Sequence, residues 1–160
     1  MTVIDERTFT IAAQEQLAGL YRLSLSILRS PADAQDAVQQ GMLRAWERRA
    51  QVNDPEKLGA WFRRIVINEC RNIQRKRMRV FPAEELPYTE QERALENGEL
   101  RQALHTLPEG LRTPLLLKYM EGMTEKEVSA ALRIPLSSVK NRLFRARRKL
   151  QKLLNEEVSP

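Results

Sequence analysis

The sequence predicts an all-α protein with two small helical domains joined by a short acidic linker, the second domain containing a helix-turn-helix. Apolar residues recur at intervals of three and four through most of the chain, which is the period of an amphipathic helix. Hydrophobic residues make up 42% of the chain and aromatic residues 6%, as expected of helices packed through Leu, Ile, Val and Ala. The run VFPAEELPYT interrupts this period with two prolines and two glutamates. We therefore expect domains over residues 1–80 and 94–160, with a linker over 81–93.

Three helices are expected in the first domain, over residues 9–28, 32–49 and 55–79. Ser30-Pro31 separates the first two, and Asp54-Pro55 is a favourable start for the third because proline fits the first helical position. The predicted buried positions are Leu17, Leu20, Tyr21, Ser24 and Leu28 in the first helix, Ala34, Val38, Met42, Ala45 and Trp46 in the second, and Leu58, Trp61, Phe62, Ile65, Val66 and Ile73 in the third.

The third helix also carries a polar stripe apart from its apolar face. Four residues at steps of four, three and four share one side of the helix: Arg64, Asn68, Arg71 and Arg75. From Arg63 to Arg79, seven basic residues accompany the single acid Glu69, and Trp61 lies near the start of the helix. Asparagine can pair with a base edge, and arginine with a phosphate or a guanine. The stripe indicates a nucleic-acid surface, and the alternative is an ordinary solvated helix face.

Two further helices are expected before the helix-turn-helix. Thr89 and Glu92 are placed to cap a helix that ends at Leu107-Pro108, and the segment leading into this helix is acidic. A second helix is expected over residues 108–121, with Leu111, Leu115, Leu116, Tyr119 and Met120 as its apolar positions. Gly122 is a suitable residue for its C-terminal cap.

Residues 122–152 are typical of a helix-turn-helix. Thr124 and Glu127 form a potential capping box, Pro135 breaks the helix that follows, and Ser137 or Ser138 is expected to cap the next one. Apolar residues at helical spacing predict its buried face: Val139, Leu143, Ala146, Leu150 and Leu153. The opposite face carries Lys140, Asn141, Phe144, Arg145, Arg148 and Lys152. Residues 140–152 hold seven Lys or Arg and no acid, which favours DNA binding over a packed helical hairpin.

Composition narrows the class of function. The net charge of +6 and pI of about 9.8 suit a polyanionic partner. No apolar run is long enough to span a bilayer, and the N-terminus lacks a signal-peptide pattern, so we expect a cytoplasmic protein without membrane insertion. Cys70 is the only cysteine and His105 the only histidine. With no glycine-rich phosphate loop either, we expect a binding protein rather than an enzyme, with no metal, cofactor or small-molecule substrate.

The order of these segments resembles the extracytoplasmic-function group of bacterial sigma factors. The resemblance lies in DAQDAVQQGMLRAW, WFRRIVINECRNIQRKR, the proline-containing acidic linker and LHTLPEGLRTPLLLKYMEGMTEKEVSAALRIPLSSVKNRLFRARRKL, and it covers nearly everything from residue 17 to 154. It implies that the first domain docks on the clamp of the RNA polymerase core and opens the promoter at its −10 element. The second domain would read the −35 element while resting on the polymerase flap. An anti-sigma factor is an implied further partner.

The resemblance also implies roles for particular residues. Asp36, Gln39 and Gln40 match the stretch pressed against the clamp, although Gln40-Gly41 stands where the family usually has Glu and a larger residue. Arg64 and Asn68 match positions facing −10 DNA, and residues 50–58 match a loop that holds a flipped base. The candidate −10 residues are Trp61, Arg64, Asn68, Arg71 and Arg75. The candidate −35 residues are Ser138, Lys140, Asn141, Arg142, Phe144, Arg145 and Arg148, of which Lys140, Asn141, Phe144 and Arg145 match groove-facing positions.

Three other functions remain open from the sequence. A DNA-binding regulator that acts without polymerase would need a dimer interface, of which the sequence gives no clear sign. An RNA-binding protein would use both basic helices without distinguishing promoters. A structural interaction module would direct the same helices toward acidic protein partners.

Overall fold

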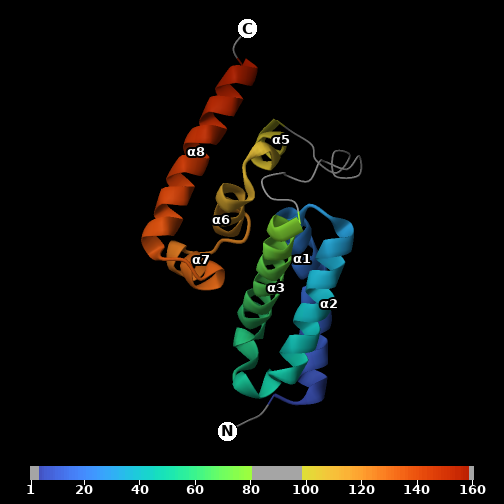
Figure 1. Ribbon diagram of the computed structural model, residues 1–160. Coiled ribbons are helices and arrows are strands. Elements are labelled where there is room, and N and C mark those ends of the chain that lie inside the picture. Colours follow the sequence, from blue (N-terminus) through green and yellow to red (C-terminus); the bar gives the residue numbers. More distant parts are fainter. Residues whose placement is uncertain (1–3, 81–98, 159–160) are drawn as a thin grey trace. The chain divides into compact units, whose positions relative to one another are not determined.

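The computed structural model describes residues 4–80 and 99–158, and within these ranges it contains helices and no strand (Figure 1). This confirms the all-α prediction. The chain divides into two compact units, Met1–Ala83 and Glu84–Pro160. The predicted linker over residues 81–93 and the predicted cap at Thr89 lie outside the described residues.

The first unit packs three long helices against one another: α1 (Glu6–Leu28), α2 (Pro31–Glu47) and α3 (Leu58–Val80). Short 3-10 turns at Arg49–Gln51 and Pro55–Lys57 connect α2 to α3. The core between the helices contains Leu20, Leu23, Ile27, Leu28, Ala34, Ala37, Val38, Ala45, Leu58, Phe62, Val66, Ile67 and Cys70. Near the connection, the ring of Phe9 meets the rings of Trp46 and Phe62 edge-on, at centroid distances of 5.3 and 5.4 Å.

Helix α1 differs from its predicted form at its start and on its buried face. It begins at Glu6, earlier than expected, because the Asp5 carboxylate caps it by accepting from the Thr8 amide at 2.7 Å. Leu17 is 42% exposed, so its predicted burial is wrong. Counting 3.6 residues per turn from the buried Phe9 places the buried stripe at Gln16 rather than Leu17, and the Gln16 side chain lies beside Gly59.

Helix α2 begins as its sequence predicts, with Ser30 as N-cap and Pro31 in the first turn. Its contact with α3 is close at Gly41, where an added Cβ would lie 2.7 Å from Val66 Cγ2 and 3.4 Å from Val66 Cα. Glycine therefore permits this approach despite its cost within a helix. Of the expected core positions on these two helices, Met42, Trp46, Trp61, Ile65 and Ile73 are half-buried instead.

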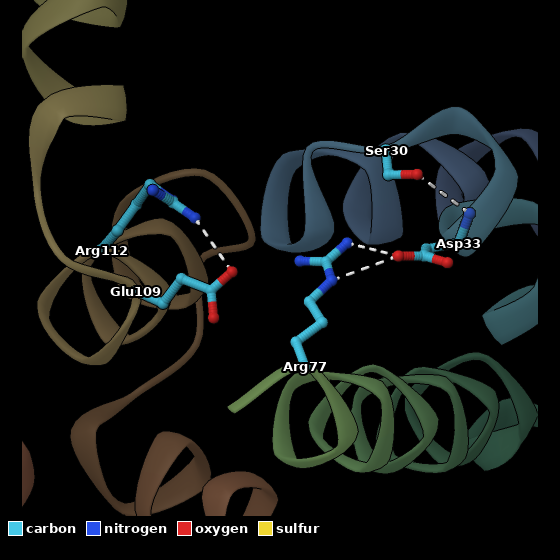
Figure 2. A network of polar contacts seen from close by, with 5 residues as sticks. All are labelled: Ser30, Asp33, Arg77, Glu109 and Arg112. Atoms are coloured by element: carbon cyan, nitrogen blue, oxygen red, sulfur yellow. Dashed lines mark hydrogen bonds and ion pairs between the residues drawn. The ribbon is translucent and has the colours of Figure 1, made fainter. Parts of the chain in front are cut away.

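An ion pair joins the first turn of α2 to the last turns of α3 (Figure 2). Arg77 donates from Nη2 and Nε to the same Asp33 oxygen, at 2.6 and 3.2 Å. The amide of Asp33 also donates to the Ser30 hydroxyl at 3.3 Å. Asp33 thus belongs both to the first turn of α2 and to the packing of α2 against α3.

The second unit is organised around its last helix. It comprises α5 (Glu99–Thr106), α6 (Glu109–Tyr119), α7 (Glu125–Leu132) and α8 (Leu136–Val158), and α8 contacts each of the other three. Apolar residues from all four form the core: Ala103, Leu107, Leu111, Leu115, Leu116, Leu117, Val128, Ala131, Leu132, Val139, Leu143 and Ala146.

Arg112 is the unusual member of this core, since it is 0% exposed. Its Nη1 donates to the Leu107 carbonyl at 3.1 Å, and its Nη2 lies 3.7 Å from a Glu109 carboxylate oxygen (Figure 2). The guanidinium thus satisfies a carbonyl just beyond the end of α5, where the helix leaves acceptors unpaired.

Two predicted helix ends in this unit need correction. Helix α6 ends at Tyr119 rather than Glu121, and Tyr119 and Met120 are 57% and 54% exposed rather than buried. Gly122 follows with φ +67°, and the Met123 amide donates to the Leu117 carbonyl at 3.1 Å. The capping role predicted for Ser137 or Ser138 is wrong. Helix α8 starts at Leu136 because the Pro135 carbonyl already accepts from the amides of Ser138 and Val139.

Candidate nucleic-acid interface

The first half of the helix-turn-helix is fixed by its capping box. The Thr124 hydroxyl accepts from the Glu127 amide at 3.1 Å, and the Glu127 carboxylate accepts from the Thr124 amide at 3.2 Å. This confirms the predicted cap. A further contact joins α7 to α6, where Lys118 Nζ lies 2.9 Å from a Glu125 oxygen and, by hydrogen bonding, holds the pKa of that carboxyl below its usual range.

The turn between α7 and α8 is held by side-chain and backbone contacts. Arg133 ends α7 in the left-handed region, at φ 55°, a conformation that glycine adopts more readily. The Ser129 hydroxyl donates to the Ile134 carbonyl at 2.6 Å, while the Ile134 amide donates to the Ser129 carbonyl at 3.2 Å. These bonds set the direction in which α8 leaves the turn.

Helix α8 has one buried face and one exposed cationic face. Val139, Leu143 and Ala146 are 0% exposed, as their spacing predicts, and Leu150 and Leu153 are half-buried. The exposed side chains on the other side are those of Lys140, Asn141, Phe144, Arg145, Arg148 and Lys152.

Phe144 is the prominent apolar group among these exposed side chains, since it is 55% exposed. The Arg148 guanidinium carbon lies 5.7 Å from its ring centroid, which is a cation–π distance. An aromatic ring flanked by cations can contact a base or a thymine methyl while its neighbours contact phosphates.

The remaining polar residues of α8 are engaged to different degrees. Ser138 and Arg142 are half-buried, and an added Cβ on Gly110 would lie 3.8 Å from Arg142 Nη1, so Arg142 lies against α6. Arg147 Nη1 donates to the Tyr119 hydroxyl at 2.7 Å. The cationic run therefore divides into side chains that point to solvent and side chains that hold α8 to α6.

The second cationic surface lies on α3. Arg64 and Arg75 are exposed, whereas Asn68 and Arg71 are half-buried, so the stripe runs along the edge of the packed face. Arg75 Nη1 lies 3.5 Å from the Asn72 side-chain oxygen. Trp61 is half-buried against Phe62, at a centroid distance of 5.8 Å. The spacing of the predicted −10 residues places them along one side of α3.

Helix α2 presents the third candidate surface. Asp36, Gln39 and Gln40 are all exposed, and Leu43 beside them is 52% exposed. The sequence analysis missed Leu43, although its three-residue spacing from Gln40 places it on the same side of the helix. A cleft of about 570 Å³ lies between this surface and α3. Its lining residues are Asp36, Gln40, Arg44, Glu69, Asn72, Ile73, Arg75 and Lys76.

Three further properties of the described residues concern metal binding, the single cysteine and membrane insertion. Among them, no cluster of three or more His, Cys, Asp or Glu is suited to a metal ion. Burial raises the pKa of the Cys70 thiol from its usual 9.0 to about 12, so it remains a neutral core group at neutral pH. In the part of the chain that the structure describes, none of the helices is long and apolar enough to cross a membrane.

Two helical units, each with an exposed cationic helix and one with a helix-turn-helix, are typical of a DNA-binding protein. Comparison with protein families specifies the group. Residues 13–80 match the family described as Sigma-70 region 2, and residues 97–150 match the one described as Sigma-70, region 4. The chain belongs to the extracytoplasmic-function group of the sigma-70 family and is a sigma factor of transcription initiation.

Individual relatives resemble the chain over most of their length. The RNA polymerase sigma-E factor of Streptomyces coelicolor is 30% identical over 84% of this chain and 79% of its own. The RNA polymerase sigma-H factor of Pseudomonas aeruginosa is 26% identical, over 94% of this chain and 88% of its own. The sigma factor SigV of Bacillus subtilis is 28% identical, over 86% and 85%.

Two solved structures share the fold. The sigma factor RpoE of Bartonella quintana, crystallised with the anti-sigma factor NepR, matches 89% of this chain and 95% of its own, at 26% identity and a TM-score of 0.67. CnrH, in complex with the cytosolic domain of CnrY, matches 95% of this chain and 90% of its own, at 26% identity and a TM-score of 0.68.

Proposed function

We propose that this sigma factor binds the RNA polymerase core and directs it to promoters by reading the −35 element with α8 and opening the −10 element with α3. The observation that carries the proposal is the exposed face of α8, where Lys140, Asn141, Phe144 and Arg145 stand free of the buried face. In a helix-turn-helix, this part of the second helix enters the major groove. Arg145 takes a guanine edge, Phe144 contacts a base or a thymine methyl, and Arg142 and Arg148 serve phosphates or packing.

The proposed −10 surface is the stripe of α3 with Trp61 at its start. Arg64 and Arg75 supply exposed positive charge that attracts the phosphates of a separated strand. Asn68 pairs with a base edge, and the 3-10 turns before α3 lie in the loop proposed to hold a flipped base. Extruding a base costs a few kcal/mol, which capture of the single strand offsets.

The proposed polymerase surface is the exposed side of α2. Asp36, Gln39 and Gln40 dock on the clamp, and the second unit rests on the flap. Gln40 lacks the charge that the family usually places there, so the contact relies more on hydrogen bonds. Because the two solved relatives above are bound to an anti-sigma factor and to a partner's cytosolic domain, we also propose an anti-sigma partner for this chain, acting in the cytoplasm. The polymerase, not the sigma factor, makes the phosphodiester bonds.

Run-off transcription tests this proposal directly. Purified bacterial core polymerase is given a pool of genomic fragments with and without this protein. Discrete starts that need the protein and share two upstream elements would support the proposal and reveal the promoter. If the core is active but no start depends on the protein, and the protein alone binds duplex DNA tightly, it is instead a regulator that acts without polymerase.

A further inference from the structure

Glu69 is an acid in the middle of a cationic surface. It is the single acidic residue between Arg63 and Arg79, and it directly follows Asn68 of the proposed −10 surface. An exposed carboxylate at this point would repel the phosphates of the promoter strand. Instead its side chain is only 8% exposed and forms an ion pair with Arg44 of α2. Pairing removes the repulsion and makes burial of the carboxylate tolerable.

The pair lies between the two surfaces that must act together. Arg44 follows Gln40 by one helical turn, so it belongs to the side of α2 that carries the proposed polymerase contacts. Both partners line the cleft that also contains Asp36 and Gln40. The Arg44 side chain is 42% exposed and contacts solvent, whereas the Glu69 side chain is 8% exposed and lies in the protein interior.

The packing beside the pair makes the relative position of α2 and α3 sensitive to it. At Gly41 the two helices approach so closely that no Cβ would fit without displacing Val66. Glycine allows the two helices to approach closely, but it has no side chain that would fix the position of one helix along the other. The ion pair from Arg44 to Glu69 adds a directional contact at this point, since the Arg44 guanidinium must stay within reach of the Glu69 carboxylate.

We propose that Arg44 and Glu69 are positioning residues that hold Asn68 and the α3 stripe in register with the polymerase-docked α2, so that promoter opening, more than polymerase binding, depends on the pair. This inference rests on the proposed function. Core binding uses exposed side chains of α2, which the pair leaves in place. Opening requires Asn68 to meet a base, and a misplacement of about 1 Å can be costly for a step that depends on position.

The test uses the full chain with core polymerase and the promoter found by run-off transcription. The variants are Glu69→Gln, Arg44→Gln, their combination and Arg44→Lys. Asp33→Asn is the matched control, because it removes a second ion pair that joins α2 to α3. Core affinity is measured by titration, and opening by permanganate reactivity of −10 thymines. Transcription is also measured from the same promoter with a mismatched −10 region that is already open.

We expect Glu69→Gln to leave core affinity within about twofold, and both Glu69→Gln and Arg44→Gln to slow opening of the duplex promoter by about tenfold, a size usual for coupled neighbours. The combined variant should be no slower than either single variant. Arg44→Lys should retain most of the rate because it keeps the charge. On the pre-opened template all variants, including the Asp33→Asn control, should match the wild type.

Several results would overturn the inference. Wild-type opening rates in Glu69→Gln would show that the pair is not needed. An equal loss on duplex and pre-opened templates, or an equal loss in Asp33→Asn, would make the pair a general stabiliser of the unit. Wild-type protein that supports no start with active core would refute the proposed function itself, and with it the role of the pair.

Discussion

Arg147 of α8 donates a hydrogen bond from Nη1 to the hydroxyl of Tyr119, at 2.7 Å, and so joins the helix with the cationic face to the residue that ends α6. Arg145, two positions earlier, is exposed on the face proposed to read DNA. Both arginines belong to the basic run of α8, but Arg147 is hydrogen-bonded to Tyr119, whereas Arg145 faces solvent. Their substitution should therefore have different consequences.

We expect Arg145→Ala to cost about 1–3 kcal/mol of −35 binding and to relax preference at one base pair, as expected of a base contact. Arg147→Ala should weaken binding less and by the same factor for every sequence, because its guanidinium is already bonded to Tyr119. Competition of holoenzyme for a set of duplexes with single −35 changes measures both effects. Uniform weakening in Arg145→Ala would identify a phosphate contact instead.

Two glycines within helices of the first unit permit a matched test of packing. An alanine Cβ at Gly41 would lie 2.7 Å from Val66 Cγ2, whereas at Gly19 of α1 nothing lies within 4 Å. We expect Gly41→Ala to destabilise the first unit by about 1–3 kcal/mol through overpacking, and Gly19→Ala to stabilise it by about 0.5–1 kcal/mol through helix propensity.

Urea unfolding followed by tryptophan fluorescence measures these changes, since both tryptophans, Trp46 and Trp61, belong to the first unit. If Gly41→Ala is as stable as the wild type, the two helices can separate at this point without cost. The same result would weaken the case for a register held beside Gly41.

Local signals in the sequence account for most of the fold. The helical period, the prolines at helix starts and the capping box of Thr124 and Glu127 concern residues a few positions apart, so the helices and the helix-turn-helix could be predicted. The exposed face of α8 follows from the same period, because it is opposite Val139 and Leu143. Leu17 shows the limit of this reasoning. The helical period predicts its burial, but the buried face of α1 is shifted by one residue, so Gln16 lies at the helix interface and Leu17 is exposed.

Contacts between helices could not be predicted in the same way. Neither the pairing of Glu69 with Arg44 nor that of Arg147 with Tyr119 leaves a pattern along one helix. The sequence marks Glu69 as an isolated acid among cations, but only the packing of α2 on α3 provides its partner. The candidate surfaces could thus be predicted as faces of helices, while the residues that position them required the structure.

Arg112 provides a test of the second unit alone. Replacing it by methionine leaves the Leu107 carbonyl without the donor that lies 3.1 Å away, in a part of the core closed to water. We expect a loss of about 1–3 kcal/mol in the stability of this unit, the cost of an unsatisfied buried acceptor. Circular dichroism in urea should show an earlier transition, while the tryptophan signal of the first unit stays unchanged. A shift in the tryptophan transition would contradict the independence of this effect.

The burial of the Cys70 thiol predicts that the folded protein loses stability at alkaline pH. Because burial raises the pKa of its thiol from 9.0 to about 12, the unfolded chain releases this proton at lower pH than the folded chain does. The stabilisation is therefore fully present below pH 9.0 and is lost as the pH rises toward about 12. Urea unfolding of wild type and Cys70→Ala between pH 8 and about 10.5, a range set by thiol linkage, should show the steeper decline in the wild type. Parallel declines would refute this contribution.

Asn68→Ala should separate promoter opening from polymerase binding. Asn68 is half-buried at the edge of the α3 stripe, and its amide is the stripe's neutral group, suited to a base rather than a phosphate. We expect near-normal affinity for core polymerase and opening slowed by about tenfold, within the 1–3 kcal/mol of a good base contact.

Permanganate reactivity of the −10 region measures opening, and Arg75→Ala is the comparison. Loss of a phosphate contact should weaken binding more at low salt than at high salt, whereas loss of a base contact should be nearly independent of salt. Lost core binding in Asn68→Ala would instead show that this part of α3 docks on protein.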